Sequence, residues 1–236
     1  MNKFLSIIIV FLLVISCATN EKQMDLSGNV KGLKKGTILL QKIEDTLLIT
    51  VDSVTIKGNS TFSFSEIIEE PELYYLYVKL ENGIVRDDRI AFFAESNEII
   101  INTTLKNFEV DAKVSGSKNQ DKFIEYNKII KRYSDQNLEL IEKGYIARQN
   151  GEDSLAITIE KNQKNIISKK YLATISFALN NNDFEIAPYL MVSHVNNSRL
   201  KYLDSVYNKL TPKIKDSKYG KALESLIQSR RKNEIN

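Results

Sequence analysis

The sequence predicts an α+β fold, in which an N-terminal antiparallel β-sandwich or barrel-like domain, residues 24–116, precedes an all-helical region with a long helical hairpin, residues 117–236. Two observations support this prediction. Up to about residue 114, apolar and polar residues alternate in short segments, which is the period of half-buried strands. From Ser117 onwards, apolar residues recur every three or four positions, as in amphipathic helices. Hydrophobic residues make up 42% of the chain, so both parts can bury a core.

About eight strands are expected before Ser117, separated by turns rich in Gly, Asn and charged residues. In "STFSFSE", Phe62 and Phe64 share one face of the strand. In "ELYYLYVKLE", Tyr75 and Tyr77 share one face, and Tyr74 lies on the other. Regular spacing of short strands is typical of an antiparallel sandwich or barrel. The expected strands cover residues 24–30, 37–43, 46–56, 60–66, 72–81, 89–95, 98–104 and 108–114.

Two helices of roughly 30 residues each are expected after the strands. Ser117 and Gln120 have the spacing of a capping box at the start of the first helix. Because only a short turn at Asn150-Gly151 joins the helices, we expect them to lie antiparallel and to share their apolar stripes. The expected stripes are Phe123, Tyr126, Ile130, Tyr133, Leu140, Ile141 and Tyr145, and Leu155, Ile159, Ile166, Tyr171, Ile175 and Leu179. Shorter helices are expected over residues 184–195, 198–210 and 217–229.

The N-terminus has the pattern of a secretory signal, residues 1–16, in which Lys3 precedes an apolar run that is too short to span a membrane. The segment "VISC" resembles the bacterial lipobox. The resemblance implies cleavage between Ser16 and Cys17 and attachment of a diacylglyceryl group to Cys17, with residues 17–23 as a lipidated tether. The alternative is a free thiol that follows an ordinary signal peptide.

A lipidated Cys17 predicts a protein that is tethered to a membrane without spanning it, because two or more acyl chains anchor stably. Ala18 follows the cysteine and no Asp does, which fits the outer membrane. Whether the protein faces the periplasm or the cell surface stays open. Loss of Lys3 lowers the formal charge from +3 to +2. Since no basic patch appears, we expect no nucleic-acid binding.

Cys17 is the only cysteine in the sequence. If it carries lipid, no thiol remains for a disulfide, a thiolate metal site or a redox pair. His194 is the only histidine, and no metal-ligating residue lies three or four positions after it, so we expect a structural or exposed role. The sequence therefore predicts a protein that is not an enzyme and has neither a metal nor a cofactor.

The order of the segments "LSGNVKGLKKGTILLQKI", "TVDSVTIKGNSTFSFS", "EPELYYLYV" and "VSGSKNQDKF" resembles the N-terminal region of certain bacterial lipoproteins. In those proteins, a small β domain of unknown function and a helical spacer precede a thioredoxin-like domain. The resemblance extends from about Met24 to Leu226. It implies a fold and a location but no activity, because the redox chemistry of the longer relatives resides in the thioredoxin-like domain, which we expect this chain to lack.

Two further groups of residues are candidates for a site. Paired carboxylates can serve acid–base catalysis, although solvated turns are the more common explanation. Aromatic residues on adjoining strands can line a groove for a sugar or a peptide, although core and cross-strand pairs are more common. The carboxylates are Glu69, Glu70, Asp87 and Asp88, and the aromatic residues are Tyr74, Tyr75, Tyr77, Phe92 and Phe93.

Four tripeptides resemble the Asp-Ser/Thr-apolar acceptor of envelope O-glycosylation in some Gram-negative bacteria. They begin at Asp45, Asp52, Asp153 and Asp204.

The first prediction for the whole chain is a non-catalytic, lipid-anchored envelope protein whose hairpin binds a protein partner or self-associates as a scaffold. The alternatives are a lipoprotein that binds a glycan or small ligand, and an accessory to an envelope thiol–disulfide system.

Overall fold

The structure, a computed structural model, describes residues 22–81 and 87–235. It confirms the predicted α+β fold, with strands first and helices after them. The predicted signal peptide and the lipidation site Cys17 lie outside the described residues and stay predictions. The strands are β1 (Gln23–Lys31), β2 (Lys35–Glu44), β3 (Leu47–Lys57), β4 (Thr61–Ile67), β5 (Glu72–Leu80), β6 (Ile90–Ala94), β7 (Glu98–Thr104) and β8 (Lys113–Ser115).

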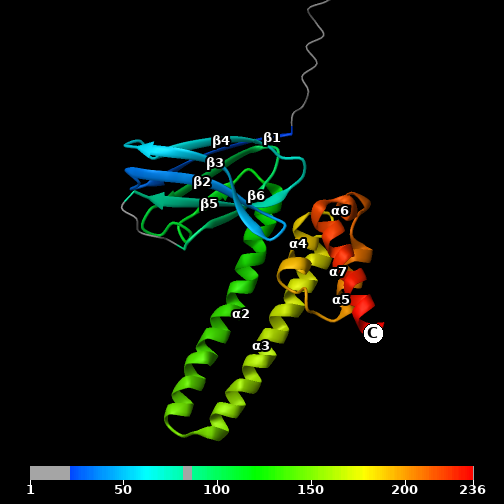
Figure 1. Cartoon of the computed structure of the whole chain (residues 1–236). Coiled ribbons are helices and arrows are strands. Elements are labelled where there is room, and N and C mark those ends of the chain that lie inside the picture. Colours follow the sequence, from blue (N-terminus) through cyan, green and yellow to red (C-terminus); the bar gives the residue numbers. More distant parts are fainter. Residues whose placement is uncertain (1–21, 82–86, 236) are drawn as a thin grey trace, which may run out of the picture.

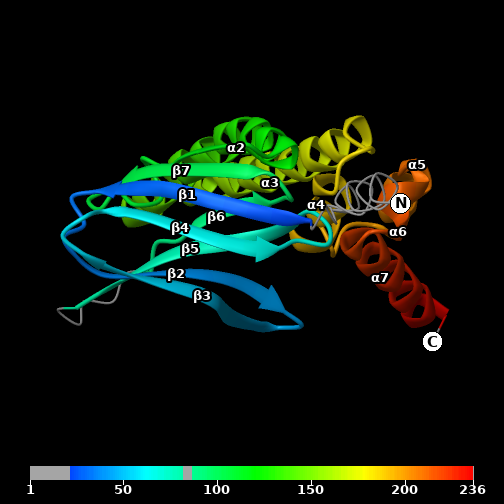
Figure 2. The same cartoon turned by 90° about the horizontal axis from the view of Figure 1, so that it is seen from above.

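The strands form two four-stranded sheets, in the orders β4-β1-β7-β8 and β3-β2-β5-β6, which pack face to face as a sandwich (Figures 1 and 2). Alternate residues of each strand fill the space between the sheets, as the period of two predicts. Phe62 and Phe64 point into this core as expected. Gly28 is needed on β1, because a Cβ atom there would lie 1.9 Å from the Ile101 carbonyl oxygen on β7.

The prediction of purely antiparallel pairing is wrong for one pair, because β1 and β7 run parallel from Asp25–Glu98 to Lys31–Thr104. These strands are not consecutive in the chain. No hairpin turn therefore fixes their relative direction, and β7 enters the first sheet after the chain has passed through the second. All other ladders in the described sheets are antiparallel.

The predicted strand over residues 108–114 is wrong for most of its length, since residues 106–111 form turns. Side chains of β7 hold these turns: the Thr103 hydroxyl donates to the Phe108 carbonyl oxygen at 2.6 Å, and the Thr104 hydroxyl donates to the Asp111 carboxylate at 2.6 Å. Phe108 is fully buried, whereas Val110 is 86% exposed. The alternation of apolar and polar residues in "FEVDAKV" therefore does not correspond to the two faces of a strand.

The helical region begins with α2 (Lys118–Gln149) and α3 (Asp153–Asn180), which form the predicted antiparallel hairpin. Ser117 caps α2, because its hydroxyl oxygen accepts a hydrogen bond from the Gln120 N–H at 3.0 Å. The remaining helices are α4 (Ile186–Ser193), α5 (Leu200–Lys209), α6 (Pro212–Asp216) and α7 (Lys218–Ile235). They pack beside the C-terminal end of α3, and the far end of the hairpin extends beyond them (Figure 1). Within residues 22–81 and 87–235, no helix is long and apolar enough to cross a membrane.

Candidate functional site

The base of the hairpin consists of the N-terminal part of α2 and the C-terminal part of α3, where both helices contact other elements. The outer face of β5 and β6 packs here against α2, α4 and α7. Phe93 of β6 is fully buried, and its ring centroid lies 5.7 Å from Phe123, 5.4 Å from Tyr189 and 6.5 Å from Tyr219. This ring cluster fixes the sandwich to the helices, since aromatic pairs at such distances attract beyond their burial.

A buried carboxylate also holds the base. Glu95, which is 9% exposed, accepts hydrogen bonds from the Asn119 N–H at 2.8 Å and from the Ser117 hydroxyl at 2.9 Å. The negative charge thus lies at the N-terminus of α2, where free N–H groups and the helix dipole stabilise it. The Asn119 side chain continues the network, donating to Glu185 at 2.8 Å and accepting from the Ile186 N–H at 2.9 Å.

This polar network was not predicted. The predicted capping box is only half present, because the Gln120 side chain accepts from the Phe93 N–H at 2.9 Å instead of binding back to Ser117. Glu95, Asn119 and Glu185 are separated by 24 and 66 positions in the chain, so their spacing carries no signal. A polar residue in the first turn of a helix, such as Asn119, is the one local hint.

The distal hairpin, which we define as residues 138–165, contacts no other element of the described chain closely enough to be buried by it. Its seam contains a small cluster of Ala147, Ala156 and Ile159. Gly144 lets the helices approach, since a Cβ atom there would lie 3.3 Å from the Ile159 Cγ2 atom. About 18 Å of α2 lies in this region.

The predicted shared stripe is wrong in the distal hairpin for Ile141, Tyr145 and Leu155, which are exposed. The contact between the two helices consists mainly of small residues and buries only a narrow strip of each helix. Side chains on either side of this strip therefore remain exposed to solvent. Leu138, Ile141 and Tyr145 lie on one side of α2, because residues three and four apart are neighbours on a helix. The exposed fractions are Leu138 66%, Ile141 49%, Tyr145 62%, Ile146 48%, Leu155 48% and Ile157 69%.

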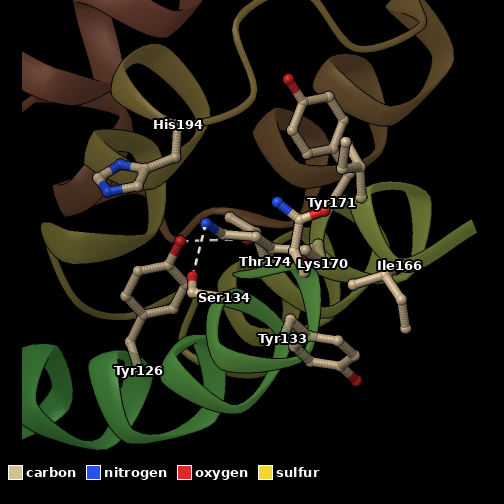
Figure 3. Close-up of a pocket in the computed structure, with 10 residues that line it drawn as sticks. Tyr126, Tyr133, Ser134, Ile166, Lys170, Tyr171, Thr174 and His194 are labelled. Atoms are coloured by element: carbon tan, nitrogen blue, oxygen red, sulfur yellow. Dashed lines mark hydrogen bonds between the residues drawn. The ribbon is translucent and has the colours of Figure 1, made fainter. Parts of the chain in front are cut away.

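A pocket of about 250 Å³ lies between α2 and α3, where the hairpin leaves the base. His194, the C-cap residue directly after α4, closes one side of it (Figure 3). The Lys170 ammonium donates to the Ser134 hydroxyl at 3.1 Å, and the Tyr126 hydroxyl lies 3.1 Å from the Thr174 hydroxyl oxygen (Figure 3). The pocket is lined by Tyr126, Tyr133, Ser134, Asn137, Ile166, Ile167, Lys170, Tyr171, Thr174 and His194.

Burial at the base shifts the pKa values of several rings there. His194 meets Tyr126 and Tyr189 edge-on at 5.5 and 5.7 Å between centroids. Burial, together with the Lys170 ammonium, lowers the pKa of His194 below its usual value. Burial raises the pKa values of Tyr126, Tyr189 and Tyr219, because a phenolate is poorly solvated there.

The five candidate aromatic residues do not line one groove. Tyr74 and Phe92 form a cross-strand pair inside the sandwich, with ring centroids 6.3 Å apart. Tyr75 and Phe93 face the helices instead. Tyr77 is partly exposed, and the Arg89 guanidinium lies 4.7 Å from its ring centroid. The period of two along β5 and β6 puts these residues on opposite faces of the sheet.

The candidate carboxylates are also dispersed. Glu70 accepts a hydrogen bond from the Lys218 N–H at 2.7 Å and so links the sandwich to α7. Glu69 and Asp87 are exposed. Across residues 22–81 and 87–235, no group of three or more His, Cys, Asp or Glu side chains is placed to hold a metal ion.

The four Asp-Ser/Thr-apolar tripeptides occupy different environments. Asp45 has a positive φ of 55° in the turn between β2 and β3, where Thr46 is exposed. Ser53 is exposed on β3, an edge strand. Ser205, in contrast, lies within α5 and donates to the Lys201 carbonyl oxygen at 2.7 Å. Glycosylation at these tripeptides stays a prediction.

Comparison with known proteins gives one match. Residues 24–123 match the model of a family described as a domain of unknown function, DUF4369. The match covers less than half of the chain and ends in the first turns of α2, so it includes Glu95 and Asn119 but not Glu185. No curated protein and no solved structure matches. The sandwich and the start of α2, residues 24–123, thus match a domain of unknown function, in agreement with the resemblance to a small β domain of unknown function.

Proposed function

We propose that this chain is a lipid-anchored protein of the cell envelope, in the outer membrane, that binds a protein partner or a second copy of itself through the distal hairpin. In this proposal, the DUF4369 domain and α4–α7 support the hairpin, and the chain performs no catalytic step. The observation that carries the proposal is the exposed apolar surface of the distal hairpin.

The location of this surface supports the proposal. Single exposed apolar residues are ordinary on protein surfaces, but a cluster of them on one projecting element marks an interaction site. Leu138, Ile141 and Tyr145 occupy one side of α2 over two turns, and Ile157 is 69% exposed on the adjoining part of α3. Helices present such rows of residues to a groove or to another helix.

The predicted anchor supports the cellular part of the proposal. A lipid on Cys17 would attach the chain to the membrane just before β1, so that the sandwich and hairpin lie at the membrane surface. Labelling of cells with a radioactive fatty acid tests this step. The label should be incorporated into the native chain and be absent from the Cys17→Ser variant, and an unlabelled native chain would refute the anchor.

Site-specific photo-crosslinking in cells tests the interaction. The structure offers a matched pair, because Ile141 and Ile124 are both isoleucines of α2 and are 49% and 48% exposed. Ile141 lies in the distal hairpin and Ile124 at the base. A photo-reactive residue at position 141 should give a discrete crosslinked product, whose mass distinguishes a second copy from another protein, and position 124 should not.

A substitution completes this test. Ile141→Lys should abolish the product formed from a photo-reactive residue at position 145, whereas Ile124→Lys should leave it unchanged. Neither substitution should alter stability much, since exposed positions tolerate change within about 0.5 kcal/mol. Equal crosslinking from positions 124 and 141, or none from either, would refute the proposed surface.

A further inference from the structure

The pocket beside His194 has the composition of a binding site for a small anion. We propose that it binds a small organic carboxylate that also carries a hydroxyl or amino group. This inference goes beyond the proposed function, because the pocket lies at the hairpin base and shares no residue with the distal hairpin. Charge, an unpaired buried acceptor and the size of the pocket support it.

The charge of the pocket is positive. Lys170 is half-buried, and its ammonium group points into the pocket toward Ser134 (Figure 3). None of the ten lining residues is Asp or Glu. In the part of the chain that the structure describes, no ion pair joins Lys170 to a carboxylate. An ammonium group that is partly removed from water favours an anionic partner, which forms a charge-assisted hydrogen bond.

The pocket also contains an acceptor that needs a donor. The Asn137 Oδ1 atom is buried and has no hydrogen-bond partner among the described residues. Buried polar atoms are almost always paired, so an unpaired one indicates a missing donor. Asn137 lies three positions after Ser134 on α2, and the two side chains are therefore neighbours on the helix. A ligand O–H or N–H would bind Asn137 while its carboxylate binds Lys170.

The walls and the volume limit the ligand to a small molecule. Tyr133, Tyr171 and Ile166 supply apolar and aromatic surface, arranged around the polar groups as Figure 3 shows. A volume of about 250 Å³ is below the usual range for drug-sized ligands and corresponds to roughly eight water molecules. A hydroxy acid or amino acid of a few carbon atoms fits this space.

Calorimetric titration of the full-length chain in detergent tests the proposal with three matched probes. Glycolate carries both groups, acetate lacks the hydroxyl, and ethylene glycol lacks the carboxylate. We expect saturable binding of glycolate, binding of acetate at least 5-fold weaker, and no detectable binding of ethylene glycol. L-Lactate and L-serine extend the series to the larger and the amino-bearing members of the class.

Variants assign the binding to this pocket. Lys170→Met should weaken glycolate binding at least 10-fold, and Lys169→Met, on the exposed neighbouring position, should leave it unchanged. Asn137→Leu should reduce glycolate affinity to that of acetate. Circular dichroism checks that each variant is folded, with Lys170→Gln in reserve if Lys170→Met is not.

Three outcomes would overturn the proposal. The first is the absence of heat from every hydroxy and amino acid with the native chain at millimolar concentration. The second is equal glycolate binding by the native chain and both Lys170 variants. The third is binding of sulfate or phosphate as tight as that of glycolate, which would indicate a site for inorganic oxyanions instead.

Discussion

The base and the distal part of the hairpin belong to the same two helices but differ in what covers them. At the base, Phe123, Tyr126 and Phe177 are buried against the sandwich and α4. In the distal hairpin, Leu138 and Tyr145 remain mostly exposed. The spacing of apolar residues along a helix therefore predicts which side chains share one side of it. Burial of that side requires another element to pack against it.

The two regions also use different polar interactions. At the base, the buried Glu95 carboxylate accepts hydrogen bonds from the cap of α2. In the distal hairpin, Glu160 forms ion pairs with Arg148 at 3.9 Å and Lys164 at 3.0 Å, all of them in solvent. Exposed ion pairs contribute little to stability, and buried charge-assisted hydrogen bonds contribute more. We therefore expect the base to carry most of the stability of the helical region.

Alkaline pH should produce the largest effect, because it acts on several residues near the base and in the sandwich at once. Burial, followed by the carboxylates of Glu72, Glu66 and Glu44, raises the pKa of Tyr74 to about 12. Burial raises the pKa values of Tyr126, Tyr189 and Tyr219 in the same direction. An unfolded tyrosine titrates near pH 10, so the folded state binds more protons above this pH.

The free energy of unfolding should therefore be fully retained below about pH 10 and fall as the pH rises through about 12. Circular dichroism at 222 nm, recorded together with tyrosinate absorbance, measures this loss. We expect the helical signal to disappear as the absorbance rises. Complete tyrosine ionisation near pH 10 with the helical signal intact would contradict the burial of these rings.

The sequence predicted those features of the fold that depend on neighbouring residues. The faces of β4, the Ser117 cap and the turn between the two long helices follow from local periodicity and from hydrogen bonds within one turn. The turns around Phe108 were missed, because side chains of Thr103 and Thr104 compete with strand pairing there. The parallel pairing of β1 with β7 was missed because it depends on the path of the whole chain.

The candidate site was predicted less well than the fold. His194 was singled out only because it is the one histidine in the sequence. Ser134 and Asn137 are neighbours on α2, but Lys170 of α3 and His194 line the same pocket only because of the tertiary fold, so their distance along the chain carries no pattern. The aromatic residues of β5 and β6 were correctly assigned to strands, but a pattern of two faces does not reveal which face lies against helices.

Phe93→Ala should produce the largest effect of a single substitution. Phe93 is fully buried among three rings, and removing a buried phenylalanine side chain costs about 3–5 kcal/mol. Leu138→Ala, at a position that is 66% exposed, should change stability by no more than about 0.5 kcal/mol. Urea denaturation measures both. Similar losses would mean that the distal hairpin is as well covered as the base.

Glu95→Gln should produce an intermediate effect. The amide keeps the shape of the side chain but removes the charge. Its oxygen can replace Oε1, which accepts from Ser117 and Asn119, but its NH₂ group then replaces Oε2 and cannot accept from the Lys118 N–H. Hydrogen bonds to a buried charged group contribute about 1.5–3 kcal/mol, which is the expected loss in urea denaturation. Glu142→Gln, at an exposed position of α2, is the control and should be nearly neutral. A neutral Glu95→Gln variant would show that the network does not stabilise the base.

Gly144→Ala should have the smallest effect and the opposite sign. Alanine favours a helix over glycine by up to about 1 kcal/mol, and the new Cβ atom would contact only the Ile159 methyl group at 3.3 Å. Because Ile159 lies in the thin distal seam, it can shift by a few tenths of an ångström. Slower amide hydrogen exchange in the distal hairpin would report the gain.

Gly220→Ala provides the comparison in α7, which packs against the base. A Cβ atom there would lie 2.0 Å from the Ile214 carbonyl oxygen and 2.6 Å from the Lys215 carbonyl oxygen, both of which are backbone atoms that cannot move aside. The same substitution should therefore destabilise α7 by about 1–3 kcal/mol in urea denaturation, the usual cost of overpacking. If Gly144→Ala lowered the free energy of unfolding as much as Gly220→Ala, the helices of the distal hairpin would be packed as rigidly as the base. A narrow contact between the two helices would then not explain why apolar residues beside it are exposed.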